Sequence, residues 1–342
     1  MILLTGATGY IGSHTWIELL ESSFQVIGVD NLSNSSLDRL VEVSTISKGS
    51  PIFIEGDITD KGLLTNIFSK YPITHVIHLA GLKDIGESMV KQKQYFDVNV
   101  GGLRNLLEVM RVHNCFKIIF SSSAAVYGDS AISPIAETAT LAPSNYYGWT
   151  KLEGERLLSD EFNKSPPISS ISLRYFNVAG QHESGLLHEY VPSKPRSLFS
   201  EIEGVLVGKT SKLPIFGSDW STTDGTCIRD YLHVTDLAKG HIDALNLLDG
   251  DKGCLALNLG LGVGQTVYEV ISAYEQVSGK LIPKRLTERR SGDVEASFAD
   301  IHLSVQMMGW RPARTLSDMC KDSYRSCTGG SGERSSHSIL GG

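Results

Sequence analysis

Short apolar runs alternate with longer amphipathic stretches along the first half of the chain. The runs are rich in β-branched residues, and the stretches between them have helical periodicity. They predict strands at Ile2–Thr5, Gln25–Val29, Ile52–Glu55, His75–Ala80 and Lys117–Ser121. Strands that alternate with helices form parallel sheets, because parallel neighbours need long crossover connections. The pattern therefore predicts an α/β fold built on a doubly wound parallel sheet.

The pattern changes from about Gln181 onward, where connections rich in Pro, Gly and Ser become frequent. Amphipathic stretches in this region predict helices at Leu198–Gly208, Val234–Leu248 and Thr266–Val277. Two apolar segments, Ser169–Phe176 and Cys254–Leu259, predict strands that return to the main sheet. We therefore expect a smaller C-terminal lobe that is not separated from the first domain by a single cut.

These features divide the chain into a larger domain and a lobe. The domain comprises residues 1–180, and residues 229–260 return to it, whereas residues 181–327 form mainly the lobe. The remaining residues, 328–342, read TGGSGERSSHSILGG and have almost no apolar side chains to bury. We expect this last segment to be a disordered tail.

Charge and composition exclude several classes of function. The chain of 342 residues has a formal net charge of -7 and no long run of Lys or Arg, which argues against nucleic acid or an anionic membrane as partner. It has no apolar run near the roughly 20 residues that a membrane span needs. The opening residues predict a strand and a turn rather than a secretion signal. We therefore expect a soluble, cytoplasmic protein.

A glycine-rich turn follows the first predicted strand. Gly6, Gly9 and Gly12 are spaced G-x-x-G-x-x-G, and the apolar-periodic stretch that follows predicts a helix. Glycines at such a turn allow backbone N–H groups to approach a pyrophosphate closely, and a helix N-terminus favours its negative charge. The sequence therefore predicts a Rossmann-like dinucleotide site at this turn.

The type of dinucleotide is indicated by Asp30, which ends the second predicted strand 18 residues after Gly12. An acid at about this distance hydrogen-bonds the 2′-hydroxyl of the adenosine ribose. The same carboxylate would repel the 2′-phosphate of NADP. We therefore predict NAD as the cofactor.

A second group of polar residues follows the fifth predicted strand. Ser123 lies at its end, and Tyr147 and Lys151 come four residues apart at the start of a helical stretch. Residues at i and i+4 share one helix face, so the ammonium of Lys151 is expected to favour the phenolate of Tyr147. Because ligands of open α/β sheets bind at the carboxyl ends of the strands, we predict Ser123, Tyr147 and Lys151 as the catalytic residues.

Other kinds of chemistry lack their signatures. The chain contains no G-x-S-x-G nucleophile elbow for acyl transfer and no H-E-x-x-H zinc motif. Its five cysteines show no C-x-x-C pairing, which argues against a disulfide framework and against a zinc site. We therefore predict no bound metal.

With these residues in place, the sequence resembles the UDP-glucose 4-epimerases of the extended short-chain dehydrogenase/reductase family. The likeness runs from Met1 to about Tyr324. It is carried by the stretches TGATGYIGSHT, VDNLSNS, EGDI, HLAGLK, SSSAAVYGD, LRYFN, DGTCIRDYLHVTDLA and RRSGDV.

The resemblance implies two sets of binding residues. Besides the three glycines and Asp30, those expected around NAD are Tyr10, Ile11, Asn31, Asp57, Ile58, Leu79, Ala80, Lys83, Asn99, Ser121, Tyr147, Lys151 and Phe176. Those expected around the UDP-sugar are Lys83, Ser123, Tyr147, Asn177, Ser197, Leu198, Phe216, Arg229, Arg290, Asp293 and Ser297. The arginines suit a diphosphate, because a guanidinium matches it in charge and geometry.

The resemblance also implies an activity and an assembly. Tyr147 would remove the proton of the hydroxyl at carbon 4 while a hydride passes to NAD, which gives a 4-keto sugar. The sugar then turns over, and the hydride returns to its opposite face. The family further implies a homodimer formed through the helices at Tyr95–Val112 and Tyr147–Phe162.

Two positions depart from the family pattern. Many relatives carry PNNL before the helix of the second lobe, whereas this chain has Pro195-Arg196-Ser197-Leu198, so Ser197 replaces an Asn that contacts the UDP-sugar. Ser297 stands where some epimerases have a bulky Tyr near the 2-substituent of the sugar. A small side chain leaves room for an N-acetyl group, so we expect UDP-GlcNAc and UDP-GalNAc to be accepted as well.

Three other functions are compatible with parts of this pattern. A nucleotide-sugar 4,6-dehydratase needs an acid/base pair where this chain has Ala124 and Ala125, so dehydration is disfavoured. A UDP-glucuronate 4-epimerase, or a related NAD-dependent nucleotide-sugar enzyme such as a decarboxylase, remains open, because a carboxylate at carbon 6 needs only a local change of partner. A catalytically silent NAD sensor is the third alternative, against which the complete set of Ser123, Tyr147 and Lys151 argues.

Overall fold

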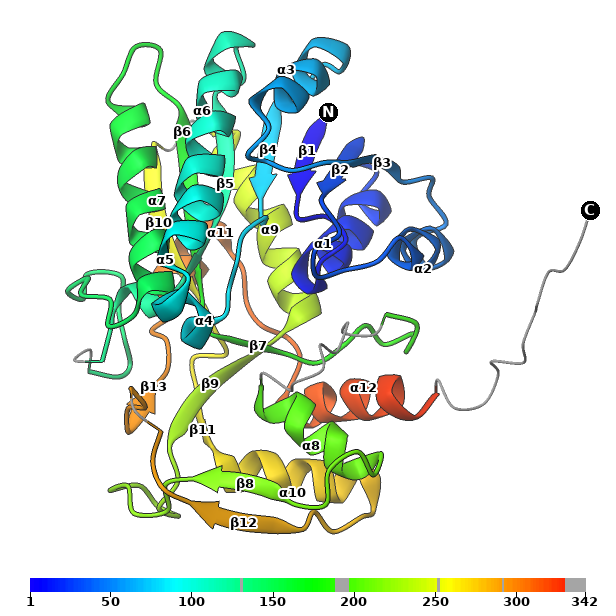
Figure 1. Cartoon of the computed structure of the whole chain (residues 1–342), viewed down its shortest axis with the longest axis vertical. Coiled ribbons are helices and arrows are strands. Elements are labelled where there is room, and N and C mark those ends of the chain that lie inside the picture. Colours follow the sequence, from blue (N-terminus) through cyan, green and yellow to red (C-terminus); the bar gives the residue numbers. More distant parts are fainter. Residues whose placement is uncertain (130–131, 188–196, 251–252, 291, 330–342) are drawn as a thin grey trace, which may run out of the picture.

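The computed structural model describes the chain except for residues 130–131, 188–196, 251–252, 291 and 330–342. A seven-stranded sheet with helices on both faces forms the larger part, and a smaller lobe lies beyond the carboxyl ends of its strands (Figure 1). The predicted α/β fold with a smaller C-terminal lobe is confirmed.

The large sheet is entirely parallel. Its strands are β1 (Ile2–Thr5), β2 (Val26–Asp30), β3 (Ile52–Glu55), β4 (His75–His78), β5 (Lys117–Ser123), β6 (Ser169–Tyr175) and β10 (Cys254–Leu259). They follow the order β10-β6-β5-β4-β1-β2-β3. The order reverses between β1 and β4, and ligands of open α/β sheets bind in the crevice at such a point.

Helices cover the two faces of this sheet with separate apolar cores. One face carries α1 (Tyr10–Glu21), α2 (Asp38–Ser47), α9 (Val234–Leu248) and α11 (His302–Met308). The other carries α3 (Lys61–Lys70), α6 (Gly102–Val112) and α7 (Tyr146–Phe162). Trp16 and Leu4 are fully buried in the first core and Phe120 almost so in the second, and each such side chain contributes about 1.5–3 kcal/mol.

Short helical segments connect the strands near their carboxyl ends. They are α4 (Ile85–Val90), α5 (Gln92–Tyr95), a π-helical turn at Phe96–Gly101 and a 3₁₀ turn at Ala124–Val126. The first three lead from β4 into α6, and the last leads from β5 into the loop before α7. They therefore border the edge of the sheet where the predicted site lies.

The smaller lobe is built from short strands and three helices. Its strands are β7 (Asn177–Ala179), β8 (Leu213–Phe216), β9 (Ile228–His233), β11 (Gly264–Thr266), β12 (Lys284–Thr287) and β13 (Ala296–Ser297). Its helices are α8 (Leu198–Leu206), α10 (Val267–Ser278) and α12 (Leu316–Gly329). Strand β9 pairs with β7, β11 and β13, and β8 pairs with β12. Phe199, Tyr274 and Met319 belong to the core that joins the three helices.

The chain crosses between the two parts more often than the sequence indicated. Within the predicted return at residues 229–260, β9 belongs to the small sheet, whereas α9 and β10 belong to the large one. Helix α11 and Trp310 also pack into the core of the large sheet. The division at residue 180 stays a prediction.

The predicted tail overlaps the last helix. Helix α12 continues to Gly329, so the first two residues of the segment 328–342 are helical rather than disordered. The side chain of Thr328 donates to the carbonyl of Tyr324 one helical turn before it. The rest of the predicted tail, residues 330–342, lies outside the described residues.

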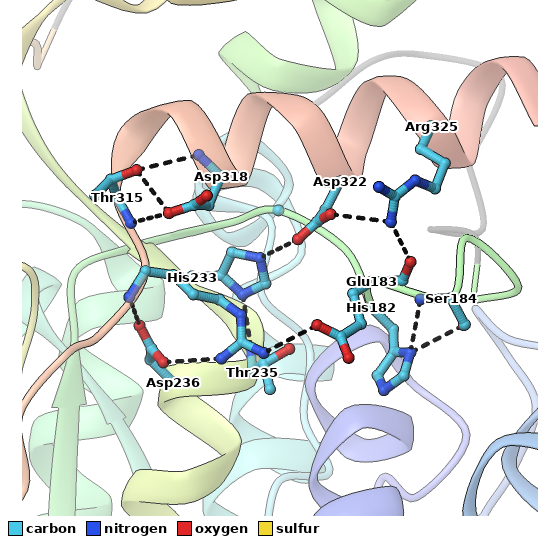
Figure 2. Close-up of polar contacts among 12 residues, drawn as sticks. His182, Glu183, Ser184, His233, Thr235, Asp236, Thr315, Asp318, Asp322 and Arg325 are labelled. Carbon is cyan, nitrogen blue, oxygen red and sulfur yellow. Dashed lines mark hydrogen bonds and ion pairs between the residues drawn. The ribbon is translucent and has the colours of Figure 1, made fainter. Parts of the chain in front are cut away.

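A polar network joins α12 of the lobe to α9 of the large domain (Figure 2). Nδ1 of the buried His233 accepts the N–H of Thr235 at 3.1 Å and thereby caps α9. The other ring nitrogen of His233 lies 3.3 Å from Oδ2 of Asp322 in α12. Asp236, in the first turn of α9, accepts hydrogen bonds from the backbone and the guanidinium of Arg314. The C-terminal segment is therefore held against the start of α9 by hydrogen bonds of the buried side chains of His233, Asp236 and Asp322.

Buried neutral histidines predict acid sensitivity of the fold. Burial lowers the pKa of His14 and His78 to about 3 and that of His241 to about 4. A group whose pKa is lower in the folded state stabilises the fold above its unfolded pKa, about 6.5, and this contribution is lost as the pH falls toward the folded value. By pH 4.5 we expect each histidine to cost about 3 kcal/mol of unfolding free energy.

Urea titrations at pH 7.5 and pH 4.5 measure this loss. The variant His241→Gln should lose about 3 kcal/mol less between the two pH values, because Gln keeps hydrogen-bonding groups but does not titrate. An equal loss in both proteins would contradict the assignment of His241.

Candidate active site

The glycine-rich turn packs too tightly for side chains at two of its positions. Gly6 has φ +71°, and a Cβ there would lie 2.7 Å from the backbone nitrogen of Ala80. A Cβ on Gly12 would lie 2.0 Å from the carbonyl oxygen of Gly6. Helix α1 begins at Tyr10, and no side chain caps it at Gly9. Its first N–H groups are therefore available to a phosphate, as the spacing of the glycines predicted.

A pocket extends from this turn along the carboxyl ends of β1, β2, β3 and β4. Predicted cofactor residues that line it are Gly6, Gly9, Tyr10, Ile11, Gly12, Asp30, Asn31, Asp57, Ile58, Leu79, Ala80, Lys83 and Ser121. It is also lined by polar residues that sequence reasoning missed, namely Thr8, Ser33, Asn34, Arg39, Gln94 and Ser200. The structure thus gathers most of the predicted cofactor residues around one pocket.

Asp30 fastens two walls of the pocket together. Its carboxylate accepts the N–H groups of Thr8, at 3.1 Å, and of Leu32, at 3.0 Å. The hydroxyl of Ser35 donates to the same carboxylate at 3.4 Å. Asp30 therefore holds the glycine-rich turn against the connection that follows β2 while it lines the pocket.

A second carboxylate faces the pocket from the connection after β3. The side-chain amide of Asn31 donates to Asp57 at 2.7 Å, and the N–H and hydroxyl of Thr59 donate to its other oxygen. Partial burial by itself raises the pKa of Asp57, but these hydrogen bonds outweigh it and lower the pKa below its usual value. Asp57 is thus held ionised beside Asn31, where it can accept hydrogen bonds from a ligand.

The predicted catalytic residues meet at the end of β5. The ammonium of Lys151 donates to the carbonyl of Ser121 at 2.7 Å and lies 5.8 Å from the centre of the Tyr147 ring. The side chain of Ser123 is hydrogen-bonded to that of Tyr147. All three predicted residues, Ser123, Tyr147 and Lys151, are therefore brought together.

Local sequence determines where α7 begins and how closely it packs. The side chain of Asn145 accepts the N–H of Gly148 at 2.8 Å and caps the helix just before Tyr147. A Cβ on Gly148 would lie 2.5 Å from the carbonyl oxygen of Ala125, and one on Gly154 would lie 2.5 Å from the Phe120 ring. The two glycines let α7 approach the end of β5 closely enough for Tyr147 to reach Ser123.

The pKa values differ from the simplest sequence expectation. Burial raises the pKa of Tyr147, and the hydrogen bond with Ser123 opposes this rise only in part. Burial also lowers the pKa of Lys151 to about 8. The ammonium of Lys151 donates to the Ser121 carbonyl and not to the phenol oxygen. The phenol is therefore protonated near neutral pH in the protein alone.

Two predicted cofactor residues serve the protein framework in this structure. The side-chain amide of Asn99 binds both backbone groups of Leu82 and the hydroxyl of Thr150. It thereby joins the connection after β4 to α7. Phe176 is 8 % exposed and packs against Leu152 and Ala299. Neither residue lines the pocket.

Charged residues predicted for the UDP-sugar form a cluster in the small lobe. Asp293 lies between two guanidinium groups, 3.3 Å from Arg229 and 3.1 Å from Arg290. The guanidinium of Arg290 also lies over the ring of Phe216, 4.5 Å from its centre. Two cations and one carboxylate leave a positive excess beside an aromatic ring, which suits a nucleoside diphosphate.

The remaining predicted substrate residues lie apart from this cluster or border it. Ser297 in β13 pairs in register with Arg229 in β9. Asn177 begins β7 and is exposed, whereas Leu198 packs at the margin of the lobe core. Ser197 caps α8 in a reciprocal hydrogen-bonded box with Ser200. The Ser197 hydroxyl therefore has a structural role, whereas the family resemblance implied a contact with the UDP-sugar at this position.

Known proteins similar to the chain indicate its family. Residues 2–260 match the NAD dependent epimerase/dehydratase family. The chain belongs to this family. It is 44 % identical over 325 residues to the UDP-glucose 4-epimerase of Dictyostelium discoideum, which covers 95 % of this chain and 94 % of the relative. The resemblance inferred from the motifs is thereby confirmed.

Solved structures of family members superpose closely on the chain. The UDP-glucose 4-epimerase of Bifidobacterium longum in complex with NAD+ and UDP has a TM-score of 0.91 and 42 % identity, over 96 % of this chain and 98 % of that one. The UDP-Glc/GlcNAc 4-epimerase of Campylobacter jejuni has a TM-score of 0.84 and 34 % identity, over 95 % of this chain and 98 % of that one.

The described residues contain neither a helix suited to a membrane nor a cluster of metal ligands. No helix there is both long and apolar enough to cross a membrane. No group of three or more His, Cys, Asp or Glu side chains there is arranged to hold a metal ion.

The missed pocket residues differ in how far the sequence could have revealed them. Ser33, Asn34 and Arg39 follow Asp30 closely, so their position after a strand end was a usable signal. Ser200 is different, because it lies in α8 of the small lobe and reaches the pocket only through the tertiary fold. No local pattern indicates that contact.

Proposed function

We propose that the chain interconverts UDP-glucose and UDP-galactose by inverting carbon 4 of the hexose through a 4-keto intermediate. The observation that carries the proposal is the meeting of Ser123, Tyr147 and Lys151 at the end of β5, beside the pocket of the glycine-rich turn. The similarity to UDP-glucose 4-epimerases over 95 % of the chain supports the same reaction.

The pocket fits NAD. Its turn has no room for a Cβ at Gly6 or Gly12, so backbone N–H groups can approach a pyrophosphate. Asp30 and Asp57 offer acceptors to ribose and adenine groups, and the Asp30 carboxylate would repel a 2′-phosphate. NAD+ held by these residues would supply a reversible hydride acceptor for carbon 4 of the sugar. Because the cofactor is regenerated in each turnover, we expect it to stay bound.

Tyr147 moves the proton in this mechanism. The positive charge of bound NAD+ would favour the Tyr147 phenolate. The phenolate would take the proton of the hydroxyl at carbon 4, and the phenol would return a proton to the same oxygen after the sugar has turned over. Ser123 holds the phenol by a hydrogen bond. Lys151 keeps a positive charge near the phenolate at pH values below its pKa of about 8.

The small lobe holds the nucleotide while the hexose turns. Arg229, Arg290 and Asp293 provide charge-assisted hydrogen bonds for the diphosphate and ribose, and Phe216 offers an aromatic face for the uracil ring. Firm binding of UDP and loose binding of the hexose allow the 4-keto sugar to present either face to the cofactor.

The proposed function is tested by incubating the purified protein with UDP-galactose without added NAD and separating the UDP-sugars. We expect UDP-glucose to form. The same assay with UDP-glucuronate tests the alternative substrate. Conversion of UDP-glucuronate alone, or no conversion of any UDP-sugar after NAD is supplied, would overturn the proposal.

N-acetylated substrates are proposed as well. Ser297 in β13 is a small residue that pairs in register with Arg229 of the cluster expected to hold the diphosphate. We predict that Ser297→Tyr lowers kcat/KM for UDP-GalNAc by about 100-fold while kcat/KM for UDP-galactose changes less than about threefold, because the ring fills the space of the N-acetyl group. The variant Ser297→Ala should keep both activities. Failure of the original protein to convert UDP-GalNAc would contradict this proposal.

A homodimer through the helices at Tyr95–Val112 and Tyr147–Phe162 is also proposed. Next to these helices, Met89 and Val90 of α4 are 52 % and 85 % exposed. Trp149 of α7 is stacked between Phe96 and Tyr146 with ring centres 6.2 and 5.0 Å away. Met89 and Val90 are exposed and the three stacked rings are half-buried, and apolar groups gathered in this way are typical of interfaces. Light scattering at micromolar concentration should give the mass of a dimer, and a monomer would refute the proposal.

We propose a cytoplasmic location on chemical grounds. All five cysteines are free, as is usual in reducing compartments. Fractionation of cells that produce the protein should place it with cytoplasmic enzymes.

A further inference from the structure

Helix α7 contacts three successive serines of β5 through one line of side chains. Tyr147, Lys151 and Glu155 are spaced four residues apart and therefore share a face of α7. Lys151 binds the carbonyl of Ser121, and Tyr147 is hydrogen-bonded to Ser123. Between these contacts, the hydroxyl of Ser122 donates to Oε1 of Glu155 at 2.5 Å. Glu155 is the only member of this line that the proposed mechanism does not use.

Glu155 is held from a second strand as well. Arg174 of β6 is the register partner of Ser122. Its Nε donates to Oε1 of Glu155 at 2.9 Å, and a terminal nitrogen donates to Oε2 at 2.6 Å. The side chains of Arg174 and Glu155 are only 5 % and 11 % exposed. A bidentate, buried pair of this kind restricts both the position and the orientation of the carboxylate.

The other arm of Arg174 reaches the segment that follows Ser123. Its second terminal nitrogen donates to the hydroxyl of Tyr127 at 3.0 Å and to the carbonyl of Glu137 at 3.2 Å. The Tyr127 hydroxyl in turn donates to the side chain of Asn258 in β10 at 2.6 Å. Arg174 therefore joins the catalytic helix, through Glu155, to the chain on the far side of Ser123.

We propose that Arg174 and Glu155 are positioning residues that set the register of α7 against β5, so that the Tyr147 phenol faces Ser123 and the carbon-4 hydroxyl of the substrate. Neither residue touches the reacting atoms. The proposal rests on the proposed epimerase function, in which Tyr147 moves the proton.

Stability by itself does not account for the pair. Charges lose their hydration on burial, and apolar residues of similar volume often stabilise a fold as well as a buried ion pair does. The pair also fixes the orientation of the Glu155 side chain, because the two N–H groups of a guanidinium bind a carboxylate in one orientation. A small error in the register of α7 would move Tyr147 relative to Ser123, and proton transfer depends steeply on such distances.

The same helix offers a matched control. Glu161, near the end of α7, is held by Arg111 of α6, whose Nε and one terminal nitrogen both donate to Oε2 of Glu161, at 3.0 and 2.6 Å. This pair anchors α7 but lies more than three helical turns beyond Tyr147. Glu155→Gln and Glu161→Gln thus remove the same charge from the same helix at different distances from the site.

Steady-state kinetics with UDP-galactose tests the proposal. We expect Glu155→Gln to lower kcat by about 100-fold while KM changes less than about threefold, because the error affects the transition state rather than UDP binding. Glu161→Gln should keep kcat within about twofold. The pH profile of kcat should also shift in Glu155→Gln and not in Glu161→Gln, because only the first change disturbs the surroundings of the phenol. Equal effects of the two changes, or an effect on KM alone, would overturn the proposal.

Two further measurements cover loss of folding and failure of the proposed function. Ser122→Ala removes one hydrogen bond to Glu155 and leaves the Arg174–Glu155 ion pair in place. It should lower kcat several-fold with an unchanged thermal midpoint; an unchanged kcat would count against the proposal.

If the unaltered protein has no epimerase activity, the proposed function fails. The positioning role is then tested by ultraviolet titration of Tyr147, read as the difference from Tyr147→Phe. Glu155→Gln should move that pKa and Glu161→Gln should not; any other result would overturn the role.

Discussion

Tyr147→Phe is expected to lower kcat for UDP-galactose epimerisation by about 1,000-fold. The phenol is hydrogen-bonded to Ser123 at the end of β5. The phenol of Tyr175 lies nearby but is hydrogen-bonded to Ser121 and His241 instead. Removing the hydroxyl removes the base and acid for the oxygen at carbon 4, whereas the ring keeps its packing. The measurement is kcat from separated UDP-sugars at saturating substrate.

The neighbouring tyrosine provides the control for this change. Tyr146 stacks on Trp149 at the start of the same helix, with ring centres 5.0 Å apart. Tyr146→Phe keeps that ring and should leave kcat within about twofold of the original value. A Tyr147→Phe protein that keeps more than a tenth of the original kcat would refute the role given to this phenol.

Gly12→Ala is expected to give a protein that is purified almost without NAD. The new Cβ would lie 2.0 Å from the carbonyl oxygen of Gly6, so either the turn or the start of α1 must move. Such overpacking costs about 1–3 kcal/mol of stability. It also displaces the N–H groups expected to hold the pyrophosphate. Absorbance of the nucleotide released on denaturation measures the NAD content per protein chain.

Gly9→Ala is the matched control for this substitution. Gly9 has φ −67°, and a Cβ there would lie 3.3 Å from the same Gly6 oxygen, so a small shift accommodates it. We expect at least half of the original NAD content in Gly9→Ala and less than about a tenth in Gly12→Ala. Similar retention in the two variants would show that the tight contact at Gly12 does not shape the cofactor site.

The large sheet could be predicted because its strands are apolar runs, and the inner ones are buried on both faces. Their signal is a continuous apolar run, and the bounds predicted for Ile2–Thr5, Ile52–Glu55 and Cys254–Leu259 agree with the structure. Two strands extend beyond their apolar residues. Strand β2 includes Asp30, and β5 continues through Ser122 and Ser123, because polar side chains at strand ends face the site rather than the core.

The short strands of the small lobe could not be predicted. Strand β13 has two residues and β7 has three, which is too short for any alternation to be visible. They exist because each pairs with β9, and these pairings join positions far apart in the chain. Strand β12 is exposed at every residue and therefore has no buried face to reveal it.

The catalytic group was predictable in part. The spacing of Tyr147 and Lys151 and the strand end at Ser123 were enough to bring the three together. The sequence did not show that burial raises the Tyr147 pKa, because desolvation depends on how closely α7 approaches β5. It also gave no signal for the Arg174–Glu155 pair, whose partners lie on different elements.

Several elements that complete the large domain come late in the chain, and this order affects how the protein folds during synthesis. Strand β10 completes one edge of the large sheet, α9 packs on α1, and α11 and Trp310 pack in the same apolar core. All of them come after Gly180 in the chain. During synthesis, therefore, the first 180 residues emerge with an uncovered strand edge and an uncovered apolar face. The cofactor domain becomes complete only after most of the smaller lobe has been made, so the two parts must mature together.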